Sequence, residues 1–187
     1  IINNGLNAWL NGMSGSSAVL LGAVLGGMMA IDMGGPVNKA AYVFGSGTLA
    51  ATMTSGGSLP MAAVMAGGMV PPIAIALASS IFKNKFTSEE REAGLTNYIM
   101  GFSFITEGAI PYAAADPTRV IPASVIGSAI AGALTGLFSI KIPAPHGGIL
   151  VMALSNNFLL YLLAVVIGSI AAAFVLGFLK PAIKQEN

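Results

Sequence analysis

Long apolar blocks, interrupted by glycine, proline and a few polar residues, dominate this chain. Hydrophobic residues make up 55% of the sequence and charged residues only 8%, whereas about a quarter of the residues in a soluble domain are charged. The solvent over most of the surface must therefore be lipid. The 24 glycines fit tightly packed membrane helices, because small residues let helix backbones approach each other. We expect an all-α polytopic membrane protein.

Composition also excludes several classes of function. The net charge is +1 and no run of basic residues is present, so nucleic acid is not an expected partner. Without cysteine, disulfides and thiolate metal sites are ruled out. A single histidine leaves little basis for a zinc site or a serine hydrolase, and we expect no metal and no cofactor.

Block length separates expected crossings from shorter segments. A helix that crosses the bilayer needs about 20 residues. The long blocks are 60–82, 120–139 and 157–179. Two adjacent prolines, 71–72, are expected to bend the first of them. The block 17–31 is shorter and ends at a polar break around Asp32, Asn38 and Lys39.

Positive charge gathers in two places along the chain. One is the loop with Lys83, Lys85 and Arg91, and the other follows the last apolar block at Lys180 and Lys184. The positive-inside rule places both in the cytoplasm. An even number of crossings must therefore lie between them.

Three apolar blocks lie between these two places: 95–115, 120–139 and 157–179. One of them cannot cross, because the number of crossings must be even. The block 95–115 contains Gly108 and Pro111, which would break it near mid-membrane, so we expect a helical hairpin that re-enters from the cytoplasm. The stretch 140–155 is short and rich in proline and glycine, and we interpret it as a second re-entrant hairpin from the opposite side. Discontinuous helices that meet near the midplane build the substrate sites of many transporters.

Glu107 lies on the first expected break and is the strongest candidate for function. A charge at the centre of the bilayer costs about 2.5–3.5 kcal/mol on insertion scales. We expect Glu107 to accept a hydrogen bond from a polar substrate or to act as a general base. The alternative is a structural pair with Arg119 or a helix N-terminus, although Arg119 is expected to pair with Asp116. Thr106 and Gly108, which flank the glutamate, are assigned to the same substrate site.

His146, Asn38 and Asp32 complete the predicted substrate site. His146 lies in "APHGG" on the second break, and a neutral imidazole can both donate and accept hydrogen bonds; it could instead cap hairpin backbone. Asn38 is either a ligand contact or a hairpin anchor, and Asp32 could also form a structural pair with Lys39. Carboxylate, imidazole and amide groups without a central cation cluster suit a neutral polyol better than an anion.

Several blocks resemble a known family. "MMAIDMGGPVNKAAY" (28–42), "FSFITEGAIPYAAADPTRVIPA" (102–123) and "APHGG" (144–148), together with "EEREAG" and "MVPPIAIALA", resemble the fructose-family permease subunit, component IIC, of the bacterial phosphoenolpyruvate-dependent sugar phosphotransferase system. The resemblance covers nearly the whole chain and corresponds to the C-terminal half of a IIC component.

The resemblance implies a function and its partners. The expected protein is a homodimer in the bacterial inner membrane, completed by the N-terminal half of IIC, and a phosphocysteine of the IIB domain phosphorylates the sugar at the cytoplasmic face. The usual product in this family is fructose 1-phosphate. Glu107 matches the glutamate of the family's Gly-Ile-x-Glu signature, which contacts the hydroxyl to be phosphorylated, and Phe104 stands where that signature often has glycine. Whether this chain alone counts as an enzyme is open, because the phosphoryl donor lies outside it.

We divide the chain into an amphipathic connector at 1–16, a transmembrane transport domain at 17–180 and a cytoplasmic tail at 181–187. Two other functions compete with group translocation. One is a proton-coupled secondary sugar transporter, with Glu107 as the proton carrier. The other is a membrane scaffold subunit that transports nothing.

Overall fold

The computed structural model describes residues 18–183, and within this range every named element is helical. The predicted connector 1–16 and most of the predicted tail lie outside the described residues. The prediction of an all-α protein is confirmed. The elements are α2 (Ala18–Ile31), α3 (Pro36–Thr52), α4 (Leu59–Ile81), α5 (Ser88–Phe102), α6 (Ile110–Ala115), α7 (Pro117–Leu137), α8 (Ile149–Met152) and α9 (Phe158–Leu179), with 3₁₀ turns η1 (Met53–Ser55), η2 (Lys83–Lys85) and η3 (Thr106–Ala109).

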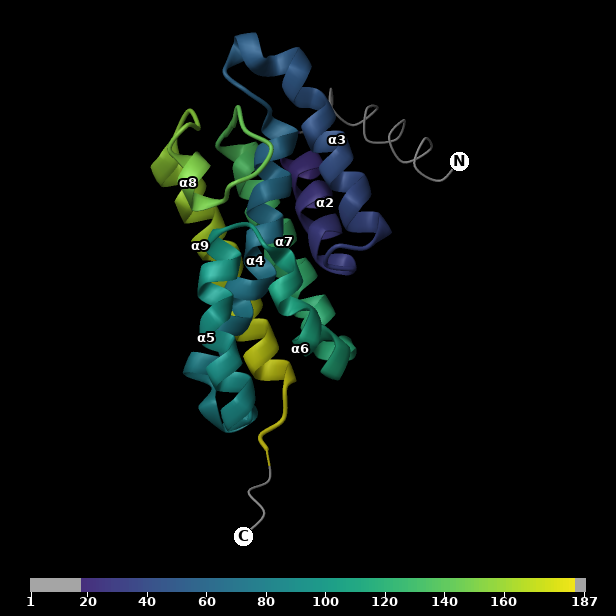
Figure 1. Ribbon diagram of the computed structural model, residues 1–187, viewed down its shortest axis with the longest axis vertical. Helices are drawn as coiled ribbons and strands as arrows, with labels where there is room; N and C mark the ends of the chain where they lie inside the picture. Colours follow the sequence, from purple (N-terminus) through teal and green to yellow (C-terminus); the bar gives the residue numbers. More distant parts are fainter. Residues whose placement is uncertain (1–17, 184–187) are drawn as a thin grey trace.

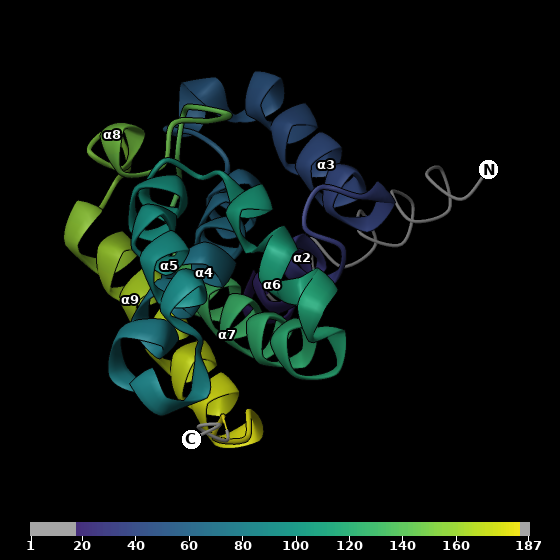
Figure 2. The ribbon, with the colours of Figure 1, turned by 60° about the horizontal axis from the view of Figure 1, so that its bottom comes forward.

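Three helices in the described range are long and apolar enough to cross a membrane: α4, α7 and α9. They correspond to the three long blocks in the sequence. Within α4, 94% of the most apolar window is buried inside the protein, against half or less in the other two. Figure 2 shows the reason, since α4 lies between α2, α5, α7 and α9. Helix α4 is therefore the packing centre of the fold.

The shorter helices lie around the two ends of α4. In Figure 1, α2 and α3 occupy the upper part of the molecule, and α5 and α6 occupy the lower part. The two basic segments meet at the lower end, where Lys85 donates a hydrogen bond to the Gly177 carbonyl and Lys180 forms an ion pair with Glu90 at 3.6 Å. Their proximity agrees with the even number of crossings that the charge pattern predicts.

Helix α4 continues as one helix through the proline pair 71–72. A proline has no N–H to donate to the carbonyl four residues earlier, so the carbonyls of Gly67 and Gly68 lose their partners within the helix. The hydroxyl of Ser128 in α7 donates to the first at 2.8 Å, and the hydroxyl of Thr106 in η3 donates to the second at 2.8 Å. Side chains of neighbouring segments commonly satisfy backbone groups freed in this way. The prolines thus fix α7 and the break after α5 to the middle of α4.

Glycines bring α2 and α7 into backbone contact, and this pair packs most extensively of all. A Cβ atom at Gly132 would collide with the carbonyl of Gly22, and one at Gly26 would collide with the carbonyl of Ser128. Small residues at a helix interface allow this close approach. The position of α2, and of the loop that follows it, therefore depends on these residues having no side chain.

Candidate functional site

Three interruptions of helical structure meet at one pocket. They are the loop 32–35 between α2 and α3, the break 103–109 between α5 and α6, and the loop 141–156, which contains the short helix α8. The pocket has a volume of about 230 Å³. Its lining residues come from these three segments and from the adjoining parts of α2 and α3: Met29, Gly34, Asn38, Lys39, Tyr42, Phe104, Thr106, Glu107 and His146.

The α5–α6 break presents Glu107 to this pocket. Thr106 is buried and held by its hydrogen bond to Gly68, whereas the Glu107 side chain is exposed. A Cβ atom placed on Gly34 would lie 3.1 Å from Glu107 Oε1, so the loop 32–35 touches the carboxylate. Arg119 pairs with Asp116 at 3.0 Å, as predicted. Within residues 18–183 the Glu107 carboxylate has no hydrogen-bond or ion-pair partner, which leaves its oxygens available to a ligand.

The loop 32–35 positions Asn38 rather than Asp32 at the pocket. The Asp32 carboxylate accepts hydrogen bonds from the backbone N–H groups of Val37 at 2.7 Å and Asn38 at 2.9 Å, and so caps the start of α3. The amide nitrogen of Asn38 donates to the Met29 carbonyl at 2.8 Å, which leaves its oxygen for a ligand. Asp32 lies outside the pocket lining, and a role for it in substrate binding remains a prediction.

The loop 141–156 brings His146 to the pocket. Its two ends are joined, because the N–H of Lys141 donates to Asn156 Oδ1 at 2.8 Å and the N–H of Asn156 donates to the Lys141 carbonyl at 3.3 Å. At its tip, the His146 ring lies 5.0 Å from the Phe104 ring between centroids. The stretch predicted as a helical hairpin contains one helical turn, α8, and is otherwise irregular, because its prolines and the left-handed glycines 147–148 interrupt helix formation.

Gly108 is the second predicted residue that the pocket lining does not include. It is buried, and a Cβ atom there would collide with the Asn97 side chain and lie 2.8 Å from Met100 Sδ. These contacts explain why no larger residue fits at position 108. They give Gly108 a role in packing the break. Contact between Gly108 and a substrate stays a prediction.

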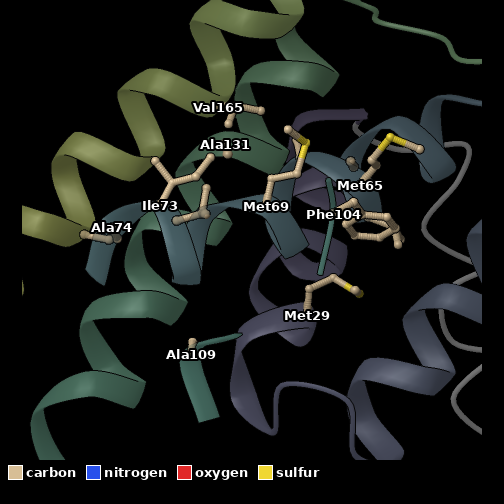
Figure 3. Packing of buried hydrophobic residues seen from close by; sticks show 14 of the residues in the cluster. Met29, Met65, Met69, Ile73, Ala74, Phe104, Ala109, Ala131 and Val165 are labelled. Atoms are coloured by element: carbon tan, nitrogen blue, oxygen red, sulfur yellow. The ribbon is translucent and has the colours of Figure 1, made fainter. Parts of the chain in front are cut away.

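Sequence reasoning missed the aromatic side of the pocket. The half-buried Tyr42 and buried Phe104 both line it. Phe104 has φ of 62°, a backbone conformation that favours glycine. In Figure 3, Phe104 lies among Met29 of α2 and Met65 of α4. Tyr42 could have been found from the sequence, because it follows Asn38 by one helical turn.

Lys39 is the second omission. From the sequence, Lys39 was considered only as a structural partner of Asp32, yet it lines the pocket together with Glu107 and His146. Its predicted structural partner, Asp32, is occupied by the N-terminus of α3. The ion pairs within the described part of the chain are those of Arg119 with Asp116 and of Lys180 with Glu90. The pocket therefore has one lysine in its lining and no cluster of cations.

Comparison with known proteins identifies relatives of the chain. Over 183 residues, 98% of this chain, it is 55% identical to the "PTS system fructose-specific EIIABC component" of Bacillus subtilis strain 168, of which it covers 28%. It is also 55% identical, over the same share of this chain, to the "Fructose permease IIC component" of Bacillus amyloliquefaciens, of which it covers 59%. The chain is a homologue of fructose-specific IIC components.

The identity to a third relative is lower. The chain is 48% identical over 182 residues to the "PTS system fructose-specific EIIB'BC component" of Escherichia coli K12, covering 96% of this chain and 32% of the relative. No protein-family model and no solved structure matches. The IIC homologue thus spans between about a quarter and three-fifths of the length of these relatives. Its three helices of crossing length make it a multi-pass membrane protein.

Proposed function

We propose that this chain binds fructose and carries it across the bacterial inner membrane for phosphorylation by a IIB component. The observation that carries the proposal is the pocket where Glu107, His146 and Asn38 converge from three separate segments. Its volume of about 230 Å³ is below the range of about 300–1,000 Å³ for drug-sized ligands, which favours a single small sugar. The names of the relatives supply fructose as the substrate.

The chemistry of the lining matches a neutral polyol. Asn38 offers an amide oxygen as acceptor, and His146 can donate or accept. The rings of Tyr42 and Phe104 provide an apolar face for the C–H groups of the sugar. Glu107 accepts a hydrogen bond from the hydroxyl that will be phosphorylated.

In the transfer step, this hydroxyl oxygen attacks the phosphorus of the IIB phosphocysteine. The O–P bond forms as the S–P bond breaks, the thiolate leaves, and the hydroxyl proton passes to Glu107. Phosphoryl transfer depends mainly on positioning and electrostatics.

Relatives named "EIIABC" and "EIIB'BC" carry a B component in the same protein, which supports IIB as the partner. We also propose the homodimer, assembly with the N-terminal half of IIC, the transport domain at 17–180 and the cytoplasmic tail at 181–187.

The α5–α6 segment is proposed to re-enter the membrane from the cytoplasm, and the loop 141–156 to re-enter from the opposite side. Support comes from Figure 1, where both arms of the first lie in the lower part and α8 lies in the upper part. The α2–α3 pair also lies in the upper part and turns at the pocket. Both tips would then meet the sugar at membrane depth.

Single-cysteine labelling tests this topology, since the chain has no cysteine of its own. We expect Asp116→Cys to react with a membrane-impermeant maleimide only from the cytoplasmic side. Lys141→Cys, at the base of the loop, should react only from outside. Both comparisons use right-side-out and inverted vesicles of the same preparation. Reaction of Asp116→Cys only from outside would show that the hairpin assignment is wrong.

Fructose uptake by membrane vesicles tests the proposed function itself. With phosphoenolpyruvate and the soluble phosphocarriers supplied, vesicles that carry the protein should accumulate fructose phosphate, and a proton uncoupler should leave this accumulation intact. Accumulation of free fructose that the uncoupler abolishes would instead support proton-coupled transport. Vesicles that move no fructose under either condition would support the scaffold.

A further inference from the structure

Lys39 is a cation in a pocket proposed for a neutral sugar. It is exposed, lies on α3 beside Asn38, and shares the pocket with Glu107 and His146. In residues 18–183 it has no ion-pair partner. Asp32 is the nearest acid in sequence, but its two oxygens accept the backbone N–H groups of Val37 and Asn38. The ammonium group is therefore available to a ligand.

Fructose carries no charge that would need a lysine, whereas the phosphoryl group does. During transfer this group must come close to the hydroxyl that Glu107 contacts, so two negative groups lie near each other. Like charges at such close range repel each other strongly at a site that is only partly solvated. A lysine in the same pocket offsets that repulsion, and lysine binds phosphate as a compact point charge.

We propose that Lys39 binds the phosphoryl group during transfer and then the phosphate of the sugar-phosphate product. This inference rests on the proposed function and extends it to a residue for which the sequence indicated no catalytic role. It divides the pocket into two parts. Asn38, His146 and Glu107 hold the neutral sugar, and Lys39 holds the anion that arrives after the sugar is bound.

Lys39→Met tests this division, because it keeps much of the side-chain length but removes the charge. We expect fructose affinity to stay within about 2-fold of the wild-type value, since the sugar itself makes no charged contact with Lys39. The rate of phosphotransfer should fall by roughly 10²-fold, the typical effect of removing one group that stabilises developing negative charge. Inhibition by added fructose 1-phosphate should weaken at least about 10-fold, the change expected from losing one charge-assisted contact.

Two matched variants complete the experiment, which uses vesicles with phosphorylated IIB. Lys39→Arg, which keeps the charge, should restore most of the rate. Lys141→Met removes a lysine whose amine donates to the Ser55 carbonyl at 3.4 Å and which does not line the pocket, so it should leave both rate and inhibition unchanged. Normal phosphotransfer in Lys39→Met would overturn the inference, as would an equal loss of fructose affinity and rate. Wild-type vesicles that accumulate only free fructose would instead contradict the proposed function.

Discussion

Replacing Glu107 by glutamine should lower the rate of phosphotransfer to fructose by about 10²–10⁴-fold, the usual contribution of a positioned general base. Fructose affinity should fall only a few-fold, because glutamine keeps the shape of the side chain and an oxygen that accepts a hydrogen bond. Glu107→Ala should lose both affinity and rate. The measurements are equilibrium binding of labelled fructose and the rate of transfer from phosphorylated IIB, made on the same preparation.

A matched control distinguishes the loss of the general base from the effect of removing one negative charge anywhere in the protein. Glu92 lies on α5, is exposed and does not line the pocket, so Glu92→Gln should leave both quantities unchanged. Phosphotransfer at the wild-type rate in both Glu107 variants would return this carboxylate to a structural role. Loss of proton-driven uptake of free fructose in Glu107→Gln would favour the proton-carrier alternative.

Gly132→Val should have the largest effect on folding. The Cβ atom of the valine would collide with the carbonyl of Gly22. This carbonyl belongs to the backbone of α2, which can move aside only if α2 separates from α7. Overpacking of this kind costs about 1–3 kcal/mol and occasionally more. The yield of monodisperse protein in detergent and its unfolding temperature measure the loss.

Gly47→Ala is the control for this substitution. Gly47 lies inside α3, and a Cβ atom there meets nothing within 4 Å. Alanine in a helix interior is favoured over glycine by about 0.5–1 kcal/mol, so Gly47→Ala should be neutral or stabilising. An unfolding temperature for Gly132→Val equal to that of the wild type would show that α2 and α7 are not in backbone contact.

Much of the fold follows from simple sequence patterns. Hydropathy and length indicate α7 and α9 closely. Thr87 or Ser88 followed by Glu90 predicts the start of α5, and the structure has Thr87 at that position with a complete capping box to Glu90. The distribution of lysine and arginine places the two basic segments on one side. Each of these features is determined by residues close together in the sequence, so it can be inferred without knowing the tertiary contacts.

The site was only partly predictable, because its contacts join segments far apart in the sequence. Four of the residues assigned to the substrate site line one pocket: Asn38, Thr106, Glu107 and His146. Their contact with a substrate stays a prediction. Asp32 illustrates the limit, since the same residue could pair with a side chain or cap the next helix, and only the course of the loop decides.

Phe104 and Lys39 show the same limit. The contact between the rings of Phe104 and His146 depends on where the loop 141–156 reaches. From the sequence, Lys39 was considered only as a structural partner of Asp32. Its place in the pocket depends on how α3 is oriented toward the α5–α6 break.

Protection of Tyr42→Cys by fructose tests most directly whether the three segments form the sugar site. Tyr42 lines the pocket, whereas Met53 is 55% exposed on η1 and lies outside it. With a small water-soluble thiol reagent, saturating fructose should slow the modification of Tyr42→Cys at least about 10-fold, because a ligand that occupies the pocket excludes the reagent. The modification of Met53→Cys should not change. Unchanged modification of Tyr42→Cys in protein that still binds fructose would contradict the account, because the sugar would then bind elsewhere.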